Sequence, residues 1–342
     1  MTLRPIVRVV PLQPHCFAFG GFEVQMNCAM ETARAAGADI APLDFWRRED
    51  DFDVLHLWGL DVQHLHTMKW GHADKKKIVL SALVSYPSWY SWFRHKVSSL
   101  VGPARIYKSM LADIDCLTVV NSAQKRYLTG TVGLLAEKVF VVPNAVDDIF
   151  FEVADRPKDG SFGIDNYVLC VGNICPRKNQ LALVKACRKL GVPLMLVGDV
   201  LTGEEDYGRS VAEAMASHNG SRWIKGLQPG SAQLANAYLD SSVYVLPSHL
   251  EQQPISALEA AACRKPLVLA NRPYAKQDLY ENAVLTDPDS IEAIAGAIRK
   301  ALDRPDVYRP PIATLEQCRR NNVGAAYHAI YKSLIHDSER GN

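Results

Sequence analysis

The sequence predicts an α/β protein with two doubly wound, Rossmann-like parallel sheets. Short apolar runs rich in Val, Ile and Leu alternate with longer helical patterns, which is typical of parallel strands joined by crossover helices. This alternation occurs once in each half of the chain. At 342 residues, the chain also exceeds the length that one hydrophobic core usually serves. We therefore expect two domains, each with its own sheet.

The expected strands recur at similar intervals in both halves. They are residues 6–12, 54–58, 78–82, 116–120 and 139–142 in the first half, and residues 167–171, 193–197, 222–224, 243–246 and 267–270 in the second. An amphipathic helix is expected early in the chain, because Phe22, Met26 and Met30 recur at helical spacing. Asn121 directly follows the fourth strand, with Gln124 three residues later, and this pattern is typical of a helix N-cap.

A polar segment without periodicity separates the two halves. It covers residues 155–166 and contains Pro and Gly, as linkers do. We place an N-terminal domain at residues 1–155 and a C-terminal domain at residues 165–312. A helix within residues 313–342 could pack back on the N-terminal domain. Doubly wound folds bind ligands at the carboxyl ends of their strands, so we expect the two domains to face a central cleft that holds the active site.

Composition and charge exclude several classes of protein. The formal net charge is +1, from 38 basic and 37 acidic residues, so no global field favours nucleic acid as a partner. No apolar run reaches the roughly 20 residues that span a bilayer. The eight cysteines include no C-x-x-C pair, and we expect no signal peptide before Arg4. We therefore expect reduced thiols and a cytoplasmic protein.

The most informative motif follows the fourth strand of the second half, where a polar turn leads into an Ala-rich helix. The amides of Ile255 and Ser256 would point out of the helix N-terminus, where a phosphate binds readily. Glu251 would lie in the loop and face a sugar, and Glu259 could accept hydrogen bonds from two ribose hydroxyls. In the alternative interpretation, Glu251 is favoured by the helix dipole and Glu259 lies on a solvated helix face.

A second motif follows the strand at residues 167–171. This strand leads to Gly172 and Asn173, and the next loop carries Arg177 and Lys178. Cations at such a strand end can neutralise the charge that accumulates on a diphosphate leaving group. A surface turn with two solvated cations is the alternative.

The third motif is the loop between the first strand and the first helix. Gly20 and Gly21 could let the backbone approach a ligand closely, although a plain tight turn fits equally well. The G-x-G-x-x-G pattern of dinucleotide-binding enzymes is absent there, and no acidic residue ends the second strand. Both absences disfavour a Rossmann-type oxidoreductase.

Together these motifs resemble family 4 glycosyltransferases in their order and spacing, over nearly the whole chain. The matching positions are Gly20 and Gly21 of an early Gly-Gly loop, the strand-plus-asparagine step VVPNAVD at residues 141–147, Gly172 with Lys178, and the E-x7-E element formed by Glu251 and Glu259. The resemblance implies a GT-B fold. It also implies a retaining enzyme that moves a hexose from a nucleotide-diphosphate sugar to a hydroxyl of a glycan or lipid-linked glycan.

The resemblance further implies individual roles, with neither a protein nucleophile nor a metal cofactor. Lys178 would contact the donor diphosphate, Glu259 the ribose and Glu251 the transferred sugar, and the leaving phosphate would accept the acceptor proton in a front-face displacement. The predicted catalytic residues are Lys178, Glu251 and Arg177. The predicted donor-binding residues are Gly21, Gly172, Asn173, Ile224, Gln253, Ile255, Ser256 and Glu259.

Three departures from the family pattern keep an alternative open. The family usually carries Arg after the strand glycine, where this chain has Asn173, so we predict that Arg177 supplies the second positive charge. The usual E-G-F-G core reads Glu251-Gln252-Gln253-Pro254 here, and the histidine that often closes the third strand is replaced by Ala82-Leu83-Val84. The alternative is a catalytically inactive GT-B-like protein that binds a nucleotide sugar or a glycan.

Acceptor-side residues are expected in the first domain. His56, at the end of its strand, is the nearest candidate for the missing histidine. Residues 86–96 combine five aromatics, among them Tyr86 and Trp89, with three cationic residues, and a basic run lies at residues 75–77. These segments could contact anionic lipid headgroups at the inner face of the membrane. They could equally be a packed helix beside a solvated face.

Overall fold

The chain divides into two compact units, and the computed structural model describes residues 4–17, 20–48, 50–82 and 103–340. Unit 1 comprises Met1–Ala145 and Arg320–Asn342, and unit 2 comprises Val146–Arg319. The polar segment at residues 155–166 therefore lies inside unit 2, where the amides of Asp159 and Gly160 donate to the carboxylate of Asp240 at 2.7 and 2.9 Å.

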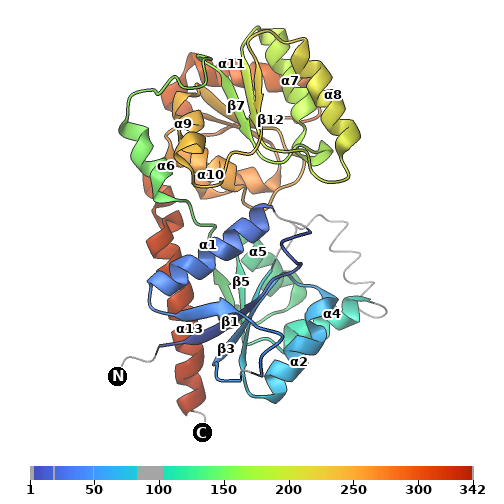
Figure 1. Cartoon of the computed structure of the whole chain (residues 1–342), viewed down its shortest axis with the longest axis vertical. Coiled ribbons are helices and arrows are strands. Elements are labelled where there is room, and N and C mark those ends of the chain that lie inside the picture. Colours follow the sequence, from blue (N-terminus) through green and yellow to red (C-terminus); the bar gives the residue numbers. More distant parts are fainter. Residues whose placement is uncertain (1–3, 18–19, 49, 83–102, 341–342) are drawn as a thin grey trace. The chain divides into compact units, whose positions relative to one another are not determined.

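Unit 1 is built on a six-stranded parallel sheet with the strand order β2-β1-β3-β4-β5-β6 (Figure 1). Its strands are β1 (Ile6–Val10), β2 (Asp39–Pro42), β3 (Val54–Trp58), β4 (Lys77–Ser81), β5 (Cys116–Val119) and β6 (Val139–Val141). Its helices are α1 (Gly21–Ala35), α2 (Leu65–Ala73), α4 (Pro103–Ala112), α5 (Ser122–Tyr127) and α13 (Arg320–Arg340).

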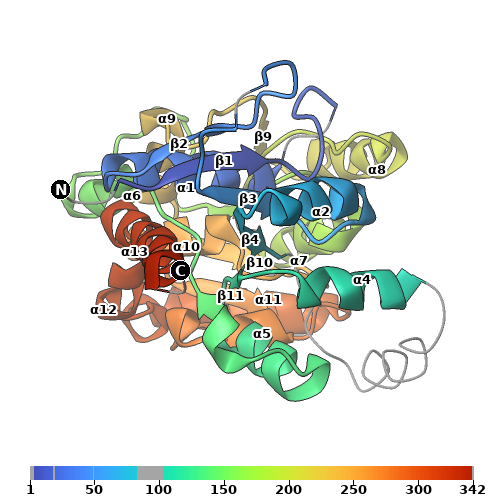
Figure 2. The same cartoon turned by 90° about the horizontal axis from the view of Figure 1, so that it is seen from below.

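Helices cover both faces of this sheet. On one face α1 lies beside the C-terminal helix α13, as both views show (Figures 1 and 2). Gly324 of α13 allows this close approach, because an added Cβ would stand 2.3 Å from the carbonyl oxygen of Thr32. On the other face Met68 of α2 and Met110 of α4 share a hydrophobic cluster with Leu57 of β3.

Unit 2 repeats the architecture with the strand order β12-β11-β10-β7-β8-β9. Its strands are β7 (Val168–Val171), β8 (Leu194–Val197), β9 (Arg222–Ile224), β10 (Val243–Leu246), β11 (Leu267–Ala270) and β12 (Val284–Thr286), and its helices are α6 (Asp148–Glu152), α7 (Gln180–Leu190), α8 (Glu205–Ala216), α9 (Ala232–Asp240), α10 (Ile255–Ala262), α11 (Ile291–Asp303) and α12 (Ile312–Leu315). Helix α7 contacts both α8 and α11, whereas α6 contacts α9 and α10.

The ten strands expected from the sequence are all present. The structure adds β2 and β12, which are edge strands of the two sheets. The predicted N-cap is also confirmed, because the Gln124 amide donates to Asn121 Oδ1 (2.9 Å) and the Val120 amide donates to Gln124 Oε1 (3.0 Å). In the described residues, no helix combines the length and the apolar character needed to cross a bilayer.

Candidate active site

The loops that leave β7 and β10 meet, because these strands are neighbours in the sheet of unit 2. The first loop contains a short 3-10 helix, Pro176–Lys178. Its Arg177 carbonyl oxygen accepts a hydrogen bond from the His249 amide (2.9 Å), and the Ser248 hydroxyl lies 3.0 Å from the same oxygen. These contacts place Arg177 and Lys178 beside the loop that carries Glu251.

Glu251 is the centre of a buried charged cluster. Its Oε1 lies 2.8 Å from Nη1 of Arg177, 2.9 Å from Nζ of Lys178 and 2.9 Å from Oγ of Ser248. The exposed fraction is about 10% for the side chains of Glu251 and Lys178 and 45% for that of Arg177. The structure thus brings the three predicted catalytic residues together, and a turn with two solvated cations is wrong for Lys178.

The electrostatics of this cluster favour an ionised carboxylate. Burial by itself would raise the pKa of Glu251, but Lys178 and Arg177 together outweigh it, and the pKa lies below its ordinary value. A buried carboxylate next to two cations is stable only while they compensate one another. The cluster therefore holds two cations that an incoming anion could engage, together with one carboxylate that would then need a new partner.

Two glycines allow the backbone of neighbouring strand ends to approach closely. Gly172 has φ of +141°, and an added Cβ would stand 3.2 Å from Nζ of Lys178. Gly198, after β8, has φ of +142°, and its added Cβ would stand 2.3 Å from the Gly172 carbonyl oxygen. Sequence reasoning did not single out Gly198, although it follows an apolar strand just as Gly172 does.

The predicted residues Asn173 and Ile224 lie next to these glycines. Asn173 is half-buried and directly follows Gly172, and the Ile224 carbonyl oxygen accepts a hydrogen bond from the Gly198 amide (3.0 Å).

Helix α10 carries the second carboxylate of the motif. Glu259 is 7% exposed, so the solvated-face interpretation is wrong, and its Oε2 accepts a 2.6 Å hydrogen bond from the hydroxyl of Tyr238. Burial raises the pKa of Glu259 to about 7. The helix begins at Ile255, and the Ser256 hydroxyl accepts a 2.6 Å hydrogen bond from Tyr244. Sequence reasoning also missed these two tyrosines.

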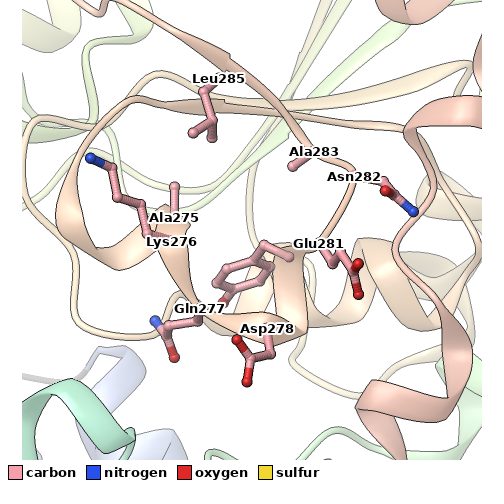
Figure 3. A pocket seen from close by; sticks show the side chains of 9 residues that line it. Ala275, Lys276, Gln277, Asp278, Glu281, Asn282, Ala283 and Leu285 are labelled. Atoms are coloured by element: carbon pink, nitrogen blue, oxygen red, sulfur yellow. The ribbon is translucent and has the colours of Figure 1, made fainter.

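Two hollows in unit 2 are lined by residues outside the charged cluster, and the side chain of Gln253 contacts a residue of one of them. The Gln253 side chain donates to Oε1 of Gln277 (3.0 Å). A hollow of about 440 Å³ lies beside Gln277, and Figure 3 shows Lys276, Asp278 and Glu281 around it. Another of about 480 Å³ lies at the amino ends of the strands, beside Lys158, Lys265 and Arg309. Of the predicted site residues, none lines either hollow in the described part of the chain.

The predicted residues of unit 1 have mixed outcomes. Gly21 is the exposed first residue of α1, and the amide of the preceding Gly20 donates to Oε2 of Glu23 (2.9 Å). Tyr86 and Trp89 lie outside the described residues. His56 is in the middle of β3, which corrects its expected place at the strand end.

His56 is part of the core of unit 1. It is 1% exposed, and its ring nitrogens contact the Tyr331 hydroxyl and the Ser81 hydroxyl, each at 2.8 Å. Burial lowers the pKa of His56 to about 3, so the ring is neutral at physiological pH. Among the described residues, no group of three or more His, Cys, Asp or Glu side chains is placed to hold a metal ion.

The two Rossmann-like sheets with these connections define the GT-B fold, and solved structures confirm it. A glycosyltransferase from Rickettsia africae matches with a TM-score of 0.73 at 15% identity, covering 98% of this chain and 99% of that one. HepE of Anabaena, solved in complex with UDP, matches with a TM-score of 0.67 at 14% identity, covering 98% of each chain.

Comparisons of the sequence with known proteins confirm the resemblance to family 4-like glycosyltransferases. Residues 152–321 match the model of the family "Glycosyl transferases group 1". The D-inositol 3-phosphate glycosyltransferase of Segniliparus rotundus is 29% identical over 215 residues, or 58% of this chain and 47% of that protein. Matches to two further D-inositol 3-phosphate glycosyltransferases cover 42% and 39% of their lengths. The chain thus matches less than half the length of these relatives.

Proposed function

We propose that this protein is a retaining glycosyltransferase that moves a hexose from a nucleotide-diphosphate sugar to a hydroxyl of a glycan or lipid-linked glycan. The observation that carries this proposal is the convergence of Arg177 and Lys178 on one oxygen of Glu251, at 2.8 and 2.9 Å. Cations in a shielded site stabilise charge that develops on a leaving group far better than cations in water do. A diphosphate leaving group gains negative charge as its bond to the sugar breaks, so two cations beside it would stabilise it.

The proposed donor pose follows from the groups around this cluster. Lys178 and Arg177 contact the diphosphate, and the free amides at the start of α10, on Ile255 and Ser256, bind a phosphate oxygen. Glu259 accepts hydrogen bonds from the ribose. Once the diphosphate engages Lys178, Glu251 needs a new donor, and a hydroxyl of the transferred sugar supplies it.

The state of Glu251 disfavours a covalent glycosyl-enzyme intermediate, so we propose that retention occurs by a front-face displacement. A carboxylate held by two cations is a weak nucleophile, so we assign it to sugar binding and not to a covalent intermediate. In the proposed step, the bond between the sugar C1 and the diphosphate oxygen breaks while the acceptor oxygen bonds to C1 from the same face. The acceptor proton passes to the departing phosphate. Arg177 and Lys178 provide the positive charge for this step, so we expect transfer to be unaffected by EDTA.

The first test is donor binding, measured by the thermal shift of the protein with UDP, GDP, ADP and dTDP. HepE of Anabaena, which has a similar fold, is solved with UDP and with UDP-glucose. Uridine nucleotides are therefore the first to be tested. The second test is release of nucleoside diphosphate from the matching sugar donor over a panel of glycan acceptors. We expect Lys178→Met to lower kcat/KM by at least about a hundredfold.

Lys189→Met is the matched control, because Lys189 forms an exposed ion pair with Glu292 elsewhere in unit 2. Equal activity of the two variants would contradict the role of Lys178. Donor binding without nucleotide release for every acceptor would favour the inactive binding protein instead.

We further propose that unit 1 contacts anionic lipid at the inner face of the membrane, where a lipid-linked acceptor would be presented. Support comes from Trp70 on α2, which is 67% exposed and follows the exposed Lys69. The basic run at residues 75–77 adds the exposed Lys75, whereas Lys76 stacks on the Phe52 ring (4.6 Å) and Lys77 pairs with Asp115 (3.3 Å) within the protein. Aromatic rings and basic side chains together favour a headgroup layer.

Flotation with anionic vesicles at low and high salt tests this contact. Trp70→Ser should weaken binding. Trp46→Ser should weaken it less, although Trp46 is 96% exposed, because the four acidic residues at positions 44, 49, 50 and 51 outnumber Arg47 and Arg48 in the same loop. Absence of salt-sensitive vesicle binding by the wild type would refute the membrane contact.

A further inference from the structure

Glu259 is buried, yet one of its oxygens has little to bind. Its Oε2 accepts the hydrogen bond from Tyr238 at 2.6 Å. In the part of the chain that the structure describes, its Oε1 accepts no hydrogen bond. This Oε1 is not among the fully buried atoms that lack a partner, so it remains accessible from outside the protein. Tyr238 on α9 therefore fixes one half of a carboxylate on α10 and leaves the other half for a ligand.

The Tyr238 side chain is held rigidly in place. It is fully buried, and its ring stands at 90° to the ring of Phe150, with 5.6 Å between the centroids. The next residues along α9 are also fixed, because Nζ of Lys265 donates to the carbonyl oxygens of Leu239 (2.5 Å) and Ser241 (3.2 Å). Burial raises the pKa of the Tyr238 hydroxyl well above its ordinary value, so this hydroxyl remains a donor.

Among the residues that the structure describes, no cation is found to interact with Glu259. The titratable groups that face it are Asp147 at the start of α6, Tyr238, Tyr244 of β10 and Cys263 at the end of α10. Burial and the charge of Asp147 oppose ionisation of Glu259, whereas the hydrogen bond from Tyr238 favours it. Glu251, by contrast, has two cations. The ionised form of Glu259 thus depends on Tyr238 more than on any other described group.

We propose that Tyr238 is a positioning residue for the nucleotide: its hydroxyl orients Glu259, so that the second carboxylate oxygen accepts the ribose hydroxyls. The inference rests on the proposed function, because it takes Glu259 as the ribose-binding group. In this proposal a residue of α9 affects nucleotide binding without contacting the nucleotide. Removing the hydroxyl should leave the packing intact and change how nucleotide affinity varies with pH.

The test is isothermal titration calorimetry with UDP, or with whichever of GDP, ADP and dTDP stabilises the wild type, at pH 6, 7, 8 and 9. For the wild type we expect affinity to rise with pH around a midpoint near the pKa of Glu259, which is about 7. For Tyr238→Phe, loss of the hydrogen bond should raise the midpoint by about one unit. The ionised fraction at pH 7 then falls from about a half to about a tenth. We therefore expect about fivefold weaker binding at pH 7 and nearly equal binding at pH 9.

Tyr167→Phe is the matched control. Tyr167 is equally buried, and its hydroxyl donates to a carbonyl of the same helix, that of Ala237, at 2.7 Å. This variant should keep the wild-type midpoint. An unshifted midpoint in Tyr238→Phe, or a loss of affinity that is the same at pH 7 and pH 9, would overturn the inference while leaving the proposed function intact. A wild type that binds none of the four nucleotides would instead refute the proposed function, and the inference with it.

Discussion

Replacing Glu259 by Gln should stabilise the protein when no ligand is bound, and the gain should grow with pH. The pKa of this carboxyl is about 7 in the folded protein, against an ordinary value of 4.5. Below pH 4.5 the carboxyl is protonated in both the folded and unfolded states, so it does not penalise folding. As the pH rises from 4.5 to 7, the unfolded chain ionises first and the folded state loses stability relative to it. Above pH 7 the loss is complete.

The size of the effect follows from the two values. A shift of one pKa unit corresponds to about 1.4 kcal/mol, so the full loss in the wild type is about 3 kcal/mol. At pH 5.5 about 1.4 kcal/mol of it is already present, and the remainder, about 2 kcal/mol, appears between pH 5.5 and pH 8. Gln has the same shape and can still accept the Tyr238 hydrogen bond, but it carries no charge to desolvate. The gain from Glu259→Gln should therefore be about 2 kcal/mol larger at pH 8 than at pH 5.5.

Urea unfolding at both pH values, followed through the transition of unit 2, measures this gain. Glu251→Gln is the control because its pKa is shifted downward, so Glu251 is ionised at both pH values. Its replacement leaves the buried ammonium of Lys178 without its carboxylate and should destabilise by about 3 kcal/mol, equally at pH 5.5 and pH 8. If Glu259→Gln gave the same gain at both pH values, burial would not be raising the pKa of Glu259, and the reasoning would be wrong.

Two backbone predictions concern positions where glycine permits a close approach. Gly198→Ala should destabilise unit 2 by at least about 2 kcal/mol in urea unfolding and weaken nucleotide binding, because its Cβ would stand 2.3 Å from a carbonyl oxygen of the neighbouring strand end. The control is Gly203→Ala, which is also at positive φ but has nothing within 4 Å, so it should cost only the backbone strain of about 1 kcal/mol. Equal losses of stability in the two variants would refute the role of the close approach. Gly324→Ala should make α13 more accessible to hydrogen exchange, because its Cβ would stand 2.3 Å from a carbonyl oxygen of α1. The control is Gly296→Ala, a helical position with open space, which should instead stabilise the protein slightly. Unchanged hydrogen exchange in Gly324→Ala would refute the packing role of this glycine.

The alternating strands and helices of both units could be predicted because the buried strands are continuous apolar runs. The strands that the sequence analysis missed, β2 and β12, are different in kind. Each lies at a sheet edge and has only four or three residues. Pro42 ends β2, and Leu285 of β12 is 40% exposed. Edge position and length alone do not explain the miss, because β6 and β9 are also three-residue edge strands and were predicted. The difference is that β2 and β12 lie among acidic and turn-forming residues, so their short apolar runs resemble a loop.

The spacing of Glu251 and Glu259 located the site but did not reveal that their environments are opposite. One signal was available in the sequence: apart from Ser256 and Glu259, the residues of α10 are all Ile, Leu or Ala, and a helix that is apolar all round is a buried helix. Its single carboxylate could therefore not lie on a solvated face. The partners that set the two pKa values could not be found in the same way. Tyr238 and Ser248 reach their carboxylates only through the packing of α9 and the β7 and β10 loops.

His56 illustrates the limit of strand-end reasoning. The apolar run ends at Trp58, and a polar residue near its end suggested a position at the edge of the sheet. The structure shows that the ring faces inward, where the Tyr331 hydroxyl of α13 contacts it across 275 residues of sequence. A histidine satisfied by two hydroxyls in a core needs no ligand to explain it, because both of its ring nitrogens already have partners.

In the proposed function, the shared use of Lys178 would link recognition of the sugar to stabilisation of the leaving group. Without a ligand, the ammonium compensates the buried charge of Glu251. A nucleoside diphosphate that drew Lys178 away would leave this carboxylate buried without full compensation, which is strongly unfavourable. A sugar hydroxyl that donates to Glu251 removes the penalty, so the complete donor gains more from the same lysine than the bare nucleotide does. We therefore expect the cations to engage the diphosphate fully only when the sugar to be transferred occupies Glu251.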